Sequence, residues 1–363
     1  MKRRKKTILM LYSILLAAFS VYFLLDTFVI ERVYSIESTT VQSAETSETS
    51  TGKGAEESET STDKGTEESD ASAGKSAETS ALPEDRSSDS TSPGQDSVTD
   101  RTLTSEVTGE EAAVSAAQKP VVTENSYSDE NISIRITEYR LNDTDIYVAD
   151  IQLSSDDYLK TALAKGAYGR NVTAKTSDTA AANNAILAIN GDYYGSQERG
   201  YVIRSGVIYR STPVSGRQDL VIYEDGSMEV VYETEISAEE LLAKGARDVL
   251  SFGPQLLGNG RITVNSGYEV AKASNSNPRT AIGMIDDLHY VFVVSDGRTS
   301  ASEGLSVYEL AEFMQSLGVK TAYNLDGGGS STMYFNGQVI NDPVGGGRGR
   351  SERSVSDIVY IGY

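Results

Sequence analysis

The composition of the chain changes abruptly near residue 120, and this change limits where a folded core can form. Between residues 35 and 120, Ser, Thr, Glu, Gly and Ala dominate, and large apolar residues are almost absent. A segment of this kind cannot bury enough apolar surface to offset the conformational entropy lost on folding. We therefore expect residues 35–120 to be a disordered acidic linker and residues 121–363 to form one large domain.

The first 34 residues predict a membrane anchor. "MKRRKK" precedes an apolar run without charges from Thr7 to Leu25, close to the roughly 20 residues that cross a bilayer. Lys and Arg before such a helix favour a cytoplasmic N-terminus, so we expect a single-pass protein of the cell membrane with an extracellular C-terminal domain. A cleavable signal peptide has the same basic start and apolar core, and that alternative stays open.

The linker contains a near-repeat that does not predict a fold. "SETSTGKGAEE" (47–57) is followed directly by "SETSTDKGTEE" (58–68). A period of 11 can indicate a right-handed coiled coil, but that structure needs apolar seam positions and the repeats have none. Repulsion between the excess acidic residues should extend the segment, so we predict a spacer that holds the domain away from the membrane.

The composition also excludes several kinds of chemistry. The chain has no cysteine, which rules out disulfides, thiolate metal sites and cysteine nucleophiles. The single histidine, His289, makes a Ser-His-Asp triad or a zinc site with several histidines improbable. The net charge of −21 argues against a nucleic-acid partner, because phosphate backbones are bound by basic surfaces.

The pattern of apolar residues in 121–363 indicates sheet with a few helices. Apolar and polar residues alternate in "NISIRITEYRL" and "DIYVADIQL", which predicts a β-hairpin. Further hairpins should turn at Ser205-Gly206 and Asp225-Gly226. A short helix should be capped by Ser177 or Asp178, and two more should follow Ser237 and Ser306, each with a glutamate three residues later. We expect an α+β fold: one domain on a mixed or antiparallel sheet with flanking helices.

Three apolar segments end in a carboxylate and a glycine, and candidate functional residues gather there. The segments are "AILAINGDYYG", "VFVVSDGR" and "YNLDGGGSS". Loops at strand ends hold side chains rigidly toward ligands. A single Asp-Gly after a strand is usually only a turn, but three in one domain favour a site. The candidates are Asn190, Asp192, Asp296, Arg298, Asp326, Ser330 and Ser331.

The glycine triplet Gly327, Gly328 and Gly329 has a further implication. Glycine allows positive φ and close approach of the backbone to a ligand. Successive N–H groups can then bind an anion, helped by the neighbouring serine hydroxyls. The loop lacks the Lys-Ser/Thr ending of a Walker sequence, so nucleotide binding gains little support.

Arginines complete the candidate site. Arg279, in "SNPRTAIG", lies just before a predicted strand and could bind a phosphate or carboxylate with a bidentate fork. A surface ion pair is the alternative for this residue. Arg348, Arg350 and Arg353 could add anion contacts or simply solvate a loop.

With these motifs assembled, the domain resembles the phosphodiester glycosidase family. The resemblance rests on "AINGDYY", "FGPQLLGNG", "NPRTAIG", "VVSDGR" and "NLDGGGSSTM", which occur in the family's order between about Ala185 and Tyr363. It implies hydrolysis of the bond that joins a sugar C1 to a phosphodiester. It also implies Asp326 and Asp192 as general acid or base, Arg279 as a ligand of the departing phosphate, and Asn190, Asp296, Arg298 and 327–331 as substrate-binding.

The substrate class and cofactor remain expectations at this point. We expect a phosphate-linked glycan, such as a cell-wall polymer or exopolysaccharide, and no certain cofactor. A divalent cation such as Ca²⁺ could assist the carboxylates. The alternatives are a glycopolymer-binding or assembly protein without catalysis, and a purely structural stalk, which would not explain the ordered motifs.

Overall fold

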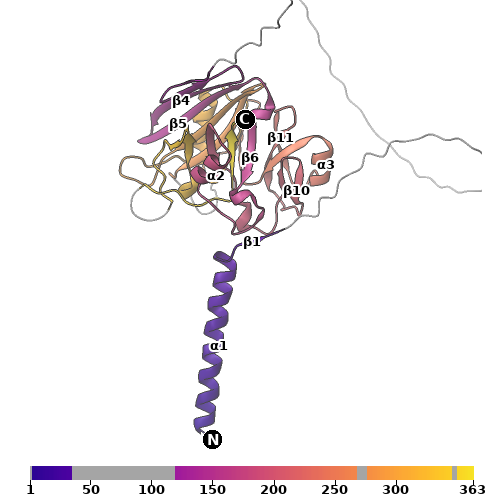
Figure 1. Ribbon diagram of the computed structural model, residues 1–363, viewed down its shortest axis with the longest axis vertical. Coiled ribbons are helices and arrows are strands. Elements are labelled where there is room, and N and C mark those ends of the chain that lie inside the picture. The colour runs from indigo at the N-terminus through magenta and orange to yellow at the C-terminus, as the bar shows by residue number, and fades with distance from the viewer. Residues whose placement is uncertain (1, 35–118, 268–275, 346–349) are drawn as a thin grey trace, which may run out of the picture. The chain divides into compact units, whose positions relative to one another are not determined.

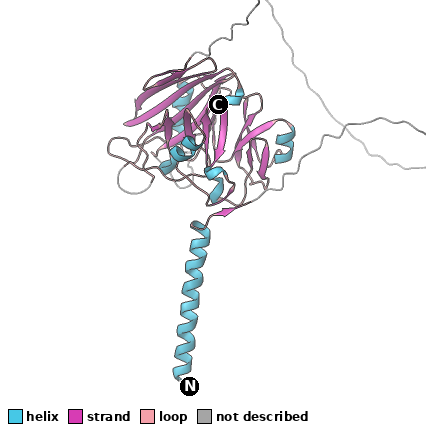
Figure 2. Cartoon of the chain, in the orientation of Figure 1, coloured by secondary structure: helices cyan, strands magenta, loops and turns pink. Residues whose placement is uncertain are grey.

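The computed structural model describes residues 2–34, 119–267, 276–345 and 350–363. The predicted linker therefore lies outside the described residues, apart from its last two positions. Antiparallel sheets dominate the domain, and short helices lie among them (Figure 2). The expected α+β class on antiparallel sheet is confirmed, with few helices.

The most extensive sheet has nine strands and is built on the predicted hairpin (Figure 1). All of its strand pairs are antiparallel. The hairpin turns at Asn142 and Asp143, which both have positive φ, as a tight hairpin turn requires. In spatial order the strands are β15 (Arg261–Ile262), β14 (Gln255–Gly258), β18 (Thr321–Asn324), β16 (Arg279–Asp286), β17 (His289–Ser295), β5 (Thr144–Leu153), β4 (Ile132–Leu141), β3 (Ser126–Ser128) and β2 (Val121–Val122).

Two five-stranded sheets and one short strand pair complete the β structure. The first contains β20 (Gln338–Val339), β19 (Met333–Phe335), β8 (Leu187–Asn190), β21 (Asp357–Ile361) and β6 (Leu159–Leu163). The second contains β10 (Val207–Arg210), β9 (Val202–Arg204), β13 (Ala246–Leu250), β11 (Gln218–Tyr223) and β12 (Met228–Tyr232). The pair is β1 (Arg32–Val33) with β7 (Gly169–Arg170).

Residues from all three larger sheets meet in one apolar core. Ile151 from β5, Ile189 from β8 and Ile222 from β11 are fully buried in the same cluster. Burial of such side chains contributes about 1.5–3 kcal/mol each to the stability of the fold. The core fixes the three sheets against one another, so the ends of β8, β16, β17 and β18 keep a constant arrangement.

Helices α3 (Ala238–Ala243) and α4 (Val307–Ser316) begin as predicted. Ser237 and Ser306 each accept the N–H of the glutamate three residues later, and that glutamate bonds back to the cap, forming a capping box. Helix α2 spans Thr176–Ala182, and the expected cap at Ser177 or Asp178 is wrong: its N-cap is Lys175, without a side-chain bond. Ser177 instead bonds to Glu352 from a distant loop, which replaces the local cap.

The N-terminal residues form helix α1 (Lys2–Phe28). Within the described part of the chain, no helix combines the length and the apolar character needed to span a membrane. The transmembrane helix predicted from the sequence is therefore not supported by the structure.

Candidate active site

The ends of β8 and β18 are joined by hydrogen bonds, which brings two of the three predicted motifs together. The Asn190 side-chain amide donates to the carbonyl of Asp326 at 2.7 Å, and the Asp326 N–H donates to Gly191 O at 3.3 Å. Asn190 Oδ1 accepts from the Thr280 hydroxyl at 2.8 Å. Asn190 is fully buried. The structure therefore places this predicted substrate-binding residue beneath the loop, where its hydrogen bonds hold the strand ends together.

Asp326 is buried but still reaches solvent, with 13% of its side chain exposed. Its Oδ2 accepts from the Ser330 hydroxyl at 2.6 Å and from Arg353 Nη2 at 2.5 Å. Burial raises the pKa of Asp326, while the Arg353 charge opposes that shift. A carboxyl group that lies at a strand end and reaches solvent can give and take protons.

The glycine loop packs against the segment that carries Arg279. Gly328 has a φ of 61° and donates its N–H to Pro278 O at 2.8 Å. A Cβ on Gly327 would lie 2.9 Å from the same carbonyl oxygen. A side chain at Gly327 would therefore push against the backbone just before β16, and the positive φ of Gly328 favours glycine.

Two arginines border the glycine loop. Arg279 is 4% exposed and donates Nε–H to Leu305 O at 2.8 Å. Arg298, which has a φ of 60°, donates Nε–H to Asn277 Oδ1 at 2.8 Å, and its Nη2 lies 3.0 Å from where a Gly328 Cβ would be. Burial, and then the Arg298 charge, lower the pKa of Arg279 to about 10. Two guanidinium groups that repel each other beside backbone N–H groups favour an anionic ligand.

Asp296 and Ser331 occupy the far side of the loop. Asp296 Oδ1 accepts from Asn341 Nδ2 at 3.0 Å and from the Asp342 N–H at 2.9 Å, and burial raises the pKa of this carboxyl. Asn341 Nδ2 also donates to Ser331 O at 3.1 Å. Asp296 therefore holds the loop through Asn341, whereas the buried Ser331 hydroxyl has no hydrogen-bond partner within the described residues.

Asp192 lies in a buried ion-pair cluster. Its Oδ1 accepts the Tyr194 N–H at 2.8 Å. Its Oδ2 accepts the Ser251 N–H at 2.9 Å and Arg204 Nη2 at 3.0 Å. The side chain of Asp192 is 0% exposed. Asp192 acts on Asp326 electrostatically, since its charge raises the pKa of the latter.

The partners of Asp192 include Arg204 and, through it, Asp357, neither of which was predicted from the sequence. Arg204 in β9 donates Nε–H to Asp357 Oδ2 at 3.0 Å as well as binding Asp192. Burial, and then the Asp192 charge, raise the pKa of Asp357 to about 8. In the sequence, Asp357 differs from other aspartates only in that it directly precedes the apolar run "IVYI". That position was the one local sign that its carboxylate is buried. Gly191 is required here because its Cβ would lie 2.5 Å from Asp357 Oδ1.

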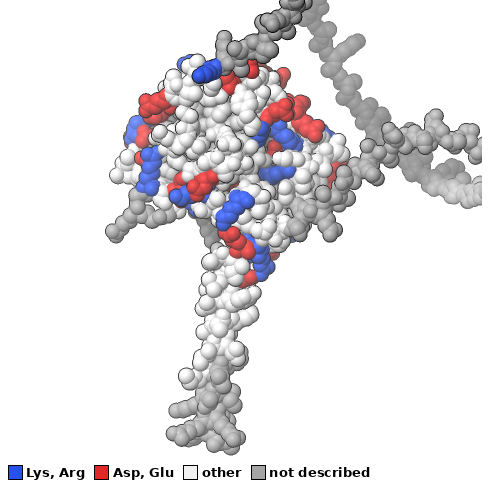
Figure 3. Space-filling view, viewed as in Figure 1, with Lys and Arg blue, Asp and Glu red and all other residues white. Residues whose placement is uncertain are grey.

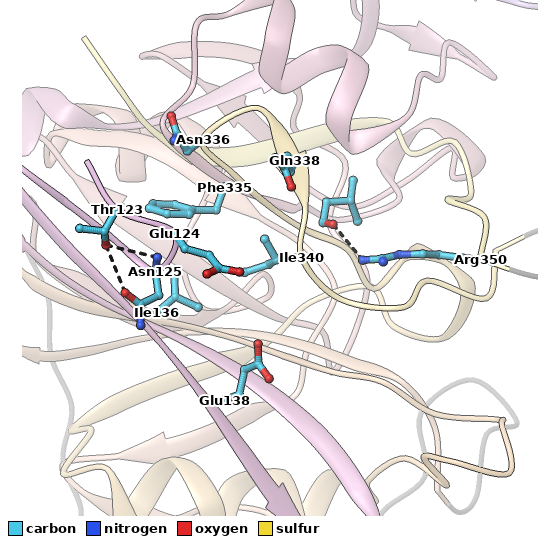
Figure 4. A pocket seen from close by; sticks show the side chains of 11 residues that line it. Thr123, Glu124, Asn125, Ile136, Glu138, Phe335, Asn336, Gln338, Ile340 and Arg350 are labelled. Carbon is cyan, nitrogen blue, oxygen red and sulfur yellow. Dashed lines mark hydrogen bonds between the residues drawn. The ribbon is translucent and has the colours of Figure 1, made fainter. Parts of the chain in front are cut away.

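A separate cavity of about 630 Å³ lies between residues 123–138 and the β19–β20 hairpin (Figure 4). Glu124 and Glu138 line one side, and Gln338 and Arg350 line the other. No predicted catalytic or substrate-binding residue contributes to this lining. The candidate site around Asp326 is thus distinct from this cavity.

Neither the surface charge nor the arrangement of metal-ligating side chains adds to the definition of the site. On the face in Figure 3, acidic and basic side chains are interspersed. Among the described residues, no group of three or more His, Asp or Glu side chains is arranged to hold a metal ion.

The site combines an accessible carboxylate with a cationic, glycine-rich loop, and this defines a class of site suited to acid–base chemistry on an anionic ester. Residues 183–362, just under half of the chain, match the phosphodiester glycosidase family. The resemblance inferred from the motifs is confirmed.

Curated relatives agree with this assignment. The N-acetylglucosamine-1-phosphodiester alpha-N-acetylglucosaminidase of Mus musculus is 28% identical over 216 residues, which cover 54% of this chain and 41% of that protein. The SPbeta prophage-derived uncharacterized protein YomE of Bacillus subtilis is 32% identical over 184 residues, covering 49% of this chain and 28% of that protein. The chain thus spans less than half the length of these relatives.

Solved structures share the fold. The catalytic domain of zebrafish N-acetylglucosamine-1-phosphodiester alpha-N-acetylglucosaminidase, auto-inhibited by its pro-peptide, aligns with a TM-score of 0.52 at 21% identity, covering 64% of this chain and 83% of that one. A hypothetical protein from Synechocystis aligns with a TM-score of 0.51 at 16% identity, covering 64% and 62% of the two chains. At these identities the likeness shows the fold alone.

Proposed function

We propose that the domain hydrolyses the bond between a sugar C1 and a phosphodiester in a cell-surface glycopolymer or related glycan. The observation that carries this proposal is the placement of Asp326 on the same glycine loop that Arg279 and Arg298 border. The family match supports a glycosidase-type activity. The name of the mouse relative, an N-acetylglucosamine-1-phosphodiester alpha-N-acetylglucosaminidase, supports a sugar linked to a phosphodiester as the substrate class.

In the proposed reaction, water forms a new bond to C1 and the bond from C1 to the phosphate oxygen breaks. The products are a free sugar and a phosphomonoester. Arg279 and Arg298 stabilise the charge on the departing phosphate. The buried Ser331 hydroxyl, which has no partner among the described residues, supplies a further donor.

Asp326 is the residue we assign to proton transfer. Its raised pKa suits a group that donates a proton to the leaving oxygen or takes one from water. Arg353 and Ser330 fix the orientation of its carboxyl group. Asp192, also predicted to be catalytic, has all its contacts inside the protein, so we assign it a positioning role beneath Asp326.

Attachment and metal dependence are part of the same proposal. We infer from the basic "MKRRKK" and the apolar residues after it that the N-terminal helix holds the enzyme at the cell membrane, with the domain outside. A Ca²⁺ ion would act, if it binds, by screening the carboxylates around Asp326.

The test uses the purified full chain with three substrates: UDP-GlcNAc, a GlcNAc-1-phosphodiester and teichoic-acid fragments. Release of free sugar from at least one of them is expected, and Asp326→Asn should abolish it. Asp286→Asn, which alters an exposed carboxylate in β16, is the matched control. A chelator arm measures metal dependence. Polymer binding that persists without any cleavage would favour the non-catalytic alternative.

A further inference from the structure

The segment after α1 forms a strand with the domain, although more than a hundred residues separate the two in sequence. Arg32 pairs with Arg170, and Val33 pairs with Gly169, in antiparallel register. The Tyr34 N–H extends the ladder by donating to Tyr168 O at 3.0 Å. An exposed strand edge takes up an extended segment in this way in many peptide complexes.

Side-chain contacts on both sides of the ladder make this pairing specific. Lys165 forms an ion pair with Glu31. The Asn171 side-chain amide donates to Ile30 O at 3.1 Å and to Thr27 O at 3.2 Å, which binds the last turn of α1 and the residues that follow it. The Tyr34 and Tyr168 rings pack with their centroids 5.8 Å apart. Charge, hydrogen-bond and aromatic contacts therefore coincide at one short segment.

The domain surface at β7 is shaped to receive a backbone. A Cβ on Gly169 would lie 2.0 Å from Arg32 O, so only glycine permits the strand to approach this closely. Asn171 has a φ of 57°, and asparagine tolerates that left-handed conformation better than most residues. This turn aims the Asn171 side-chain amide at one carbonyl in the last turn of α1 and one just after it.

We propose that residues Glu31–Tyr34 are a docking strand that binds β7 of the same chain and holds the domain at the C-terminal end of α1. The segment that pairs with β7 comes from the same chain, because the covalent connection keeps it at an effective concentration of the order of mM or below. The same segment of a second copy would have to reach that concentration to compete. This proposal is independent of the proposed catalytic function.

With the docking strand, residues 35–120 no longer act as the spacer predicted from the sequence. A spacer would set the distance between the domain and the N-terminal helix by its length. With the docking strand in place, that distance is set by the β1–β7 pairing, whatever the length of the intervening chain. Shortening the intervening segment should then leave the pairing intact as long as the chain still closes.

Cross-linking tests the proposal without background, since the chain has no native cysteine. Arg32→Cys is combined with Arg170→Cys in the full chain, kept in mild detergent because α1 exposes side chains such as Leu15 and Phe19. Directly opposite residues in an antiparallel pair have Cα atoms about 5 Å apart, within the range of a disulfide. The matched control combines Arg32→Cys with Lys320→Cys, an exposed residue next to β18.

The docked strand predicts an intramolecular disulfide that forms at least tenfold faster in the Arg32–Arg170 pair than in the Arg32–Lys320 control. Mass spectrometry of the peptides and the monomeric mobility on denaturing gels identify the link. Equal rates in the two pairs would overturn the docking, and covalent dimers alone would overturn the assignment to the same chain.

A charge exchange then tests the specificity in the same assay. Glu31→Lys should slow cross-linking of the Arg32–Arg170 pair severalfold by placing like charges at residues 31 and 165. Adding Lys165→Glu should restore the rate. Circular dichroism checks that each variant is folded. If the first change has no effect, or the second fails to rescue it, the pairing does not depend on these contacts and the proposal fails.

Discussion

The two aspartates predicted to be catalytic lie in contrasting surroundings. Asp326 has 13% of its side chain exposed and bonds to Ser330 and Arg353, whereas Asp192 is 0% exposed and lies between Arg204 and two backbone N–H groups. A group that exchanges protons with substrate must be reachable, while a group that positions others is best held rigidly. The surroundings of Asp326 therefore fit the proposed proton-transfer role, and those of Asp192 fit the proposed positioning role.

The same contrast extends to the arginines. Arg204 is buried in ion pairs with Asp192 and Asp357. Arg279 is also buried, and burial and the nearby Arg298 charge lower its pKa, while the Glu309 charge opposes that shift. Buried positive charge that is matched by carboxylates supports the fold, whereas buried positive charge beside like charge favours an anionic ligand.

The largest expected effect separates the two aspartates directly. Asp326→Asn should lower kcat by about 10²–10⁴-fold, the usual contribution of a general acid or base, and leave the melting temperature nearly unchanged. Asp192→Asn should instead lower the melting temperature, because an amide leaves Arg204 partly unpaired and faces two N–H donors. Sugar release and thermal unfolding of both variants decide this. Equal thermal destabilisation by both substitutions would contradict the separate roles proposed for Asp326 and Asp192.

The second effect concerns the buried ion pairs. Arg204→Met removes the shared cation from Asp192 and Asp357, and it should cost about 3–5 kcal/mol of unfolding free energy. Urea denaturation measures that loss. Arg140→Met is the matched control: its pair with Asp145 is exposed, and such pairs contribute only about 0–1 kcal/mol. A loss for Arg204→Met as small as that of the control would show that the cluster does not support the fold.

The third effect tests the anion site. Arg279→Lys keeps the charge but loses the planar fork, and it should lower kcat/KM about tenfold, since hydrogen bonds to charged groups contribute about 1.5–3 kcal/mol. Steady-state kinetics on the cleaved phosphodiester measure this change. Arg261→Lys, in the edge strand β15, should leave kcat/KM unchanged. An unaltered kcat/KM in Arg279→Lys would remove Arg279 from the proposed phosphate site.

The sequence predicted those features that depend on neighbouring residues. The β4–β5 hairpin follows from alternation and a short turn, and the α3 and α4 starts follow from Ser and Glu three positions apart. The position of Asp326 on a glycine loop is equally local. Each of these signals lies within a few residues, so long-range packing could not easily override it.

The hydrogen-bond partners of Asn190, Asp192 and Asp296 could not be predicted, because they come from distant segments. Asp357, which lies near Asp192 across Arg204, is 165 positions away in the sequence, and Asn341 binds Asp296 from the next hairpin. A carboxylate at a strand end looks the same in sequence whether it faces a substrate or a buried arginine. Only the packing of the sheets distinguishes the two cases.

The most gradual effect comes from Asp357, whose contribution to stability changes with pH, and it tests the buried ion-pair cluster. Its folded-state pKa of about 8 lies above its ordinary value of 3.8, so the folded protein binds an extra proton between these values. The stabilisation is fully present below the unfolded pKa and is lost as pH rises to about 8, by at most about 1.4 kcal/mol per pH unit. Asp357→Asn keeps the neutral shape but does not titrate. The difference in unfolding free energy, wild type minus Asp357→Asn, should therefore fall between pH 5 and 8. A constant difference over that range would mean that Asp357 does not titrate there and is ionised beside Asp192. Arg204 would then be shared by two negative charges.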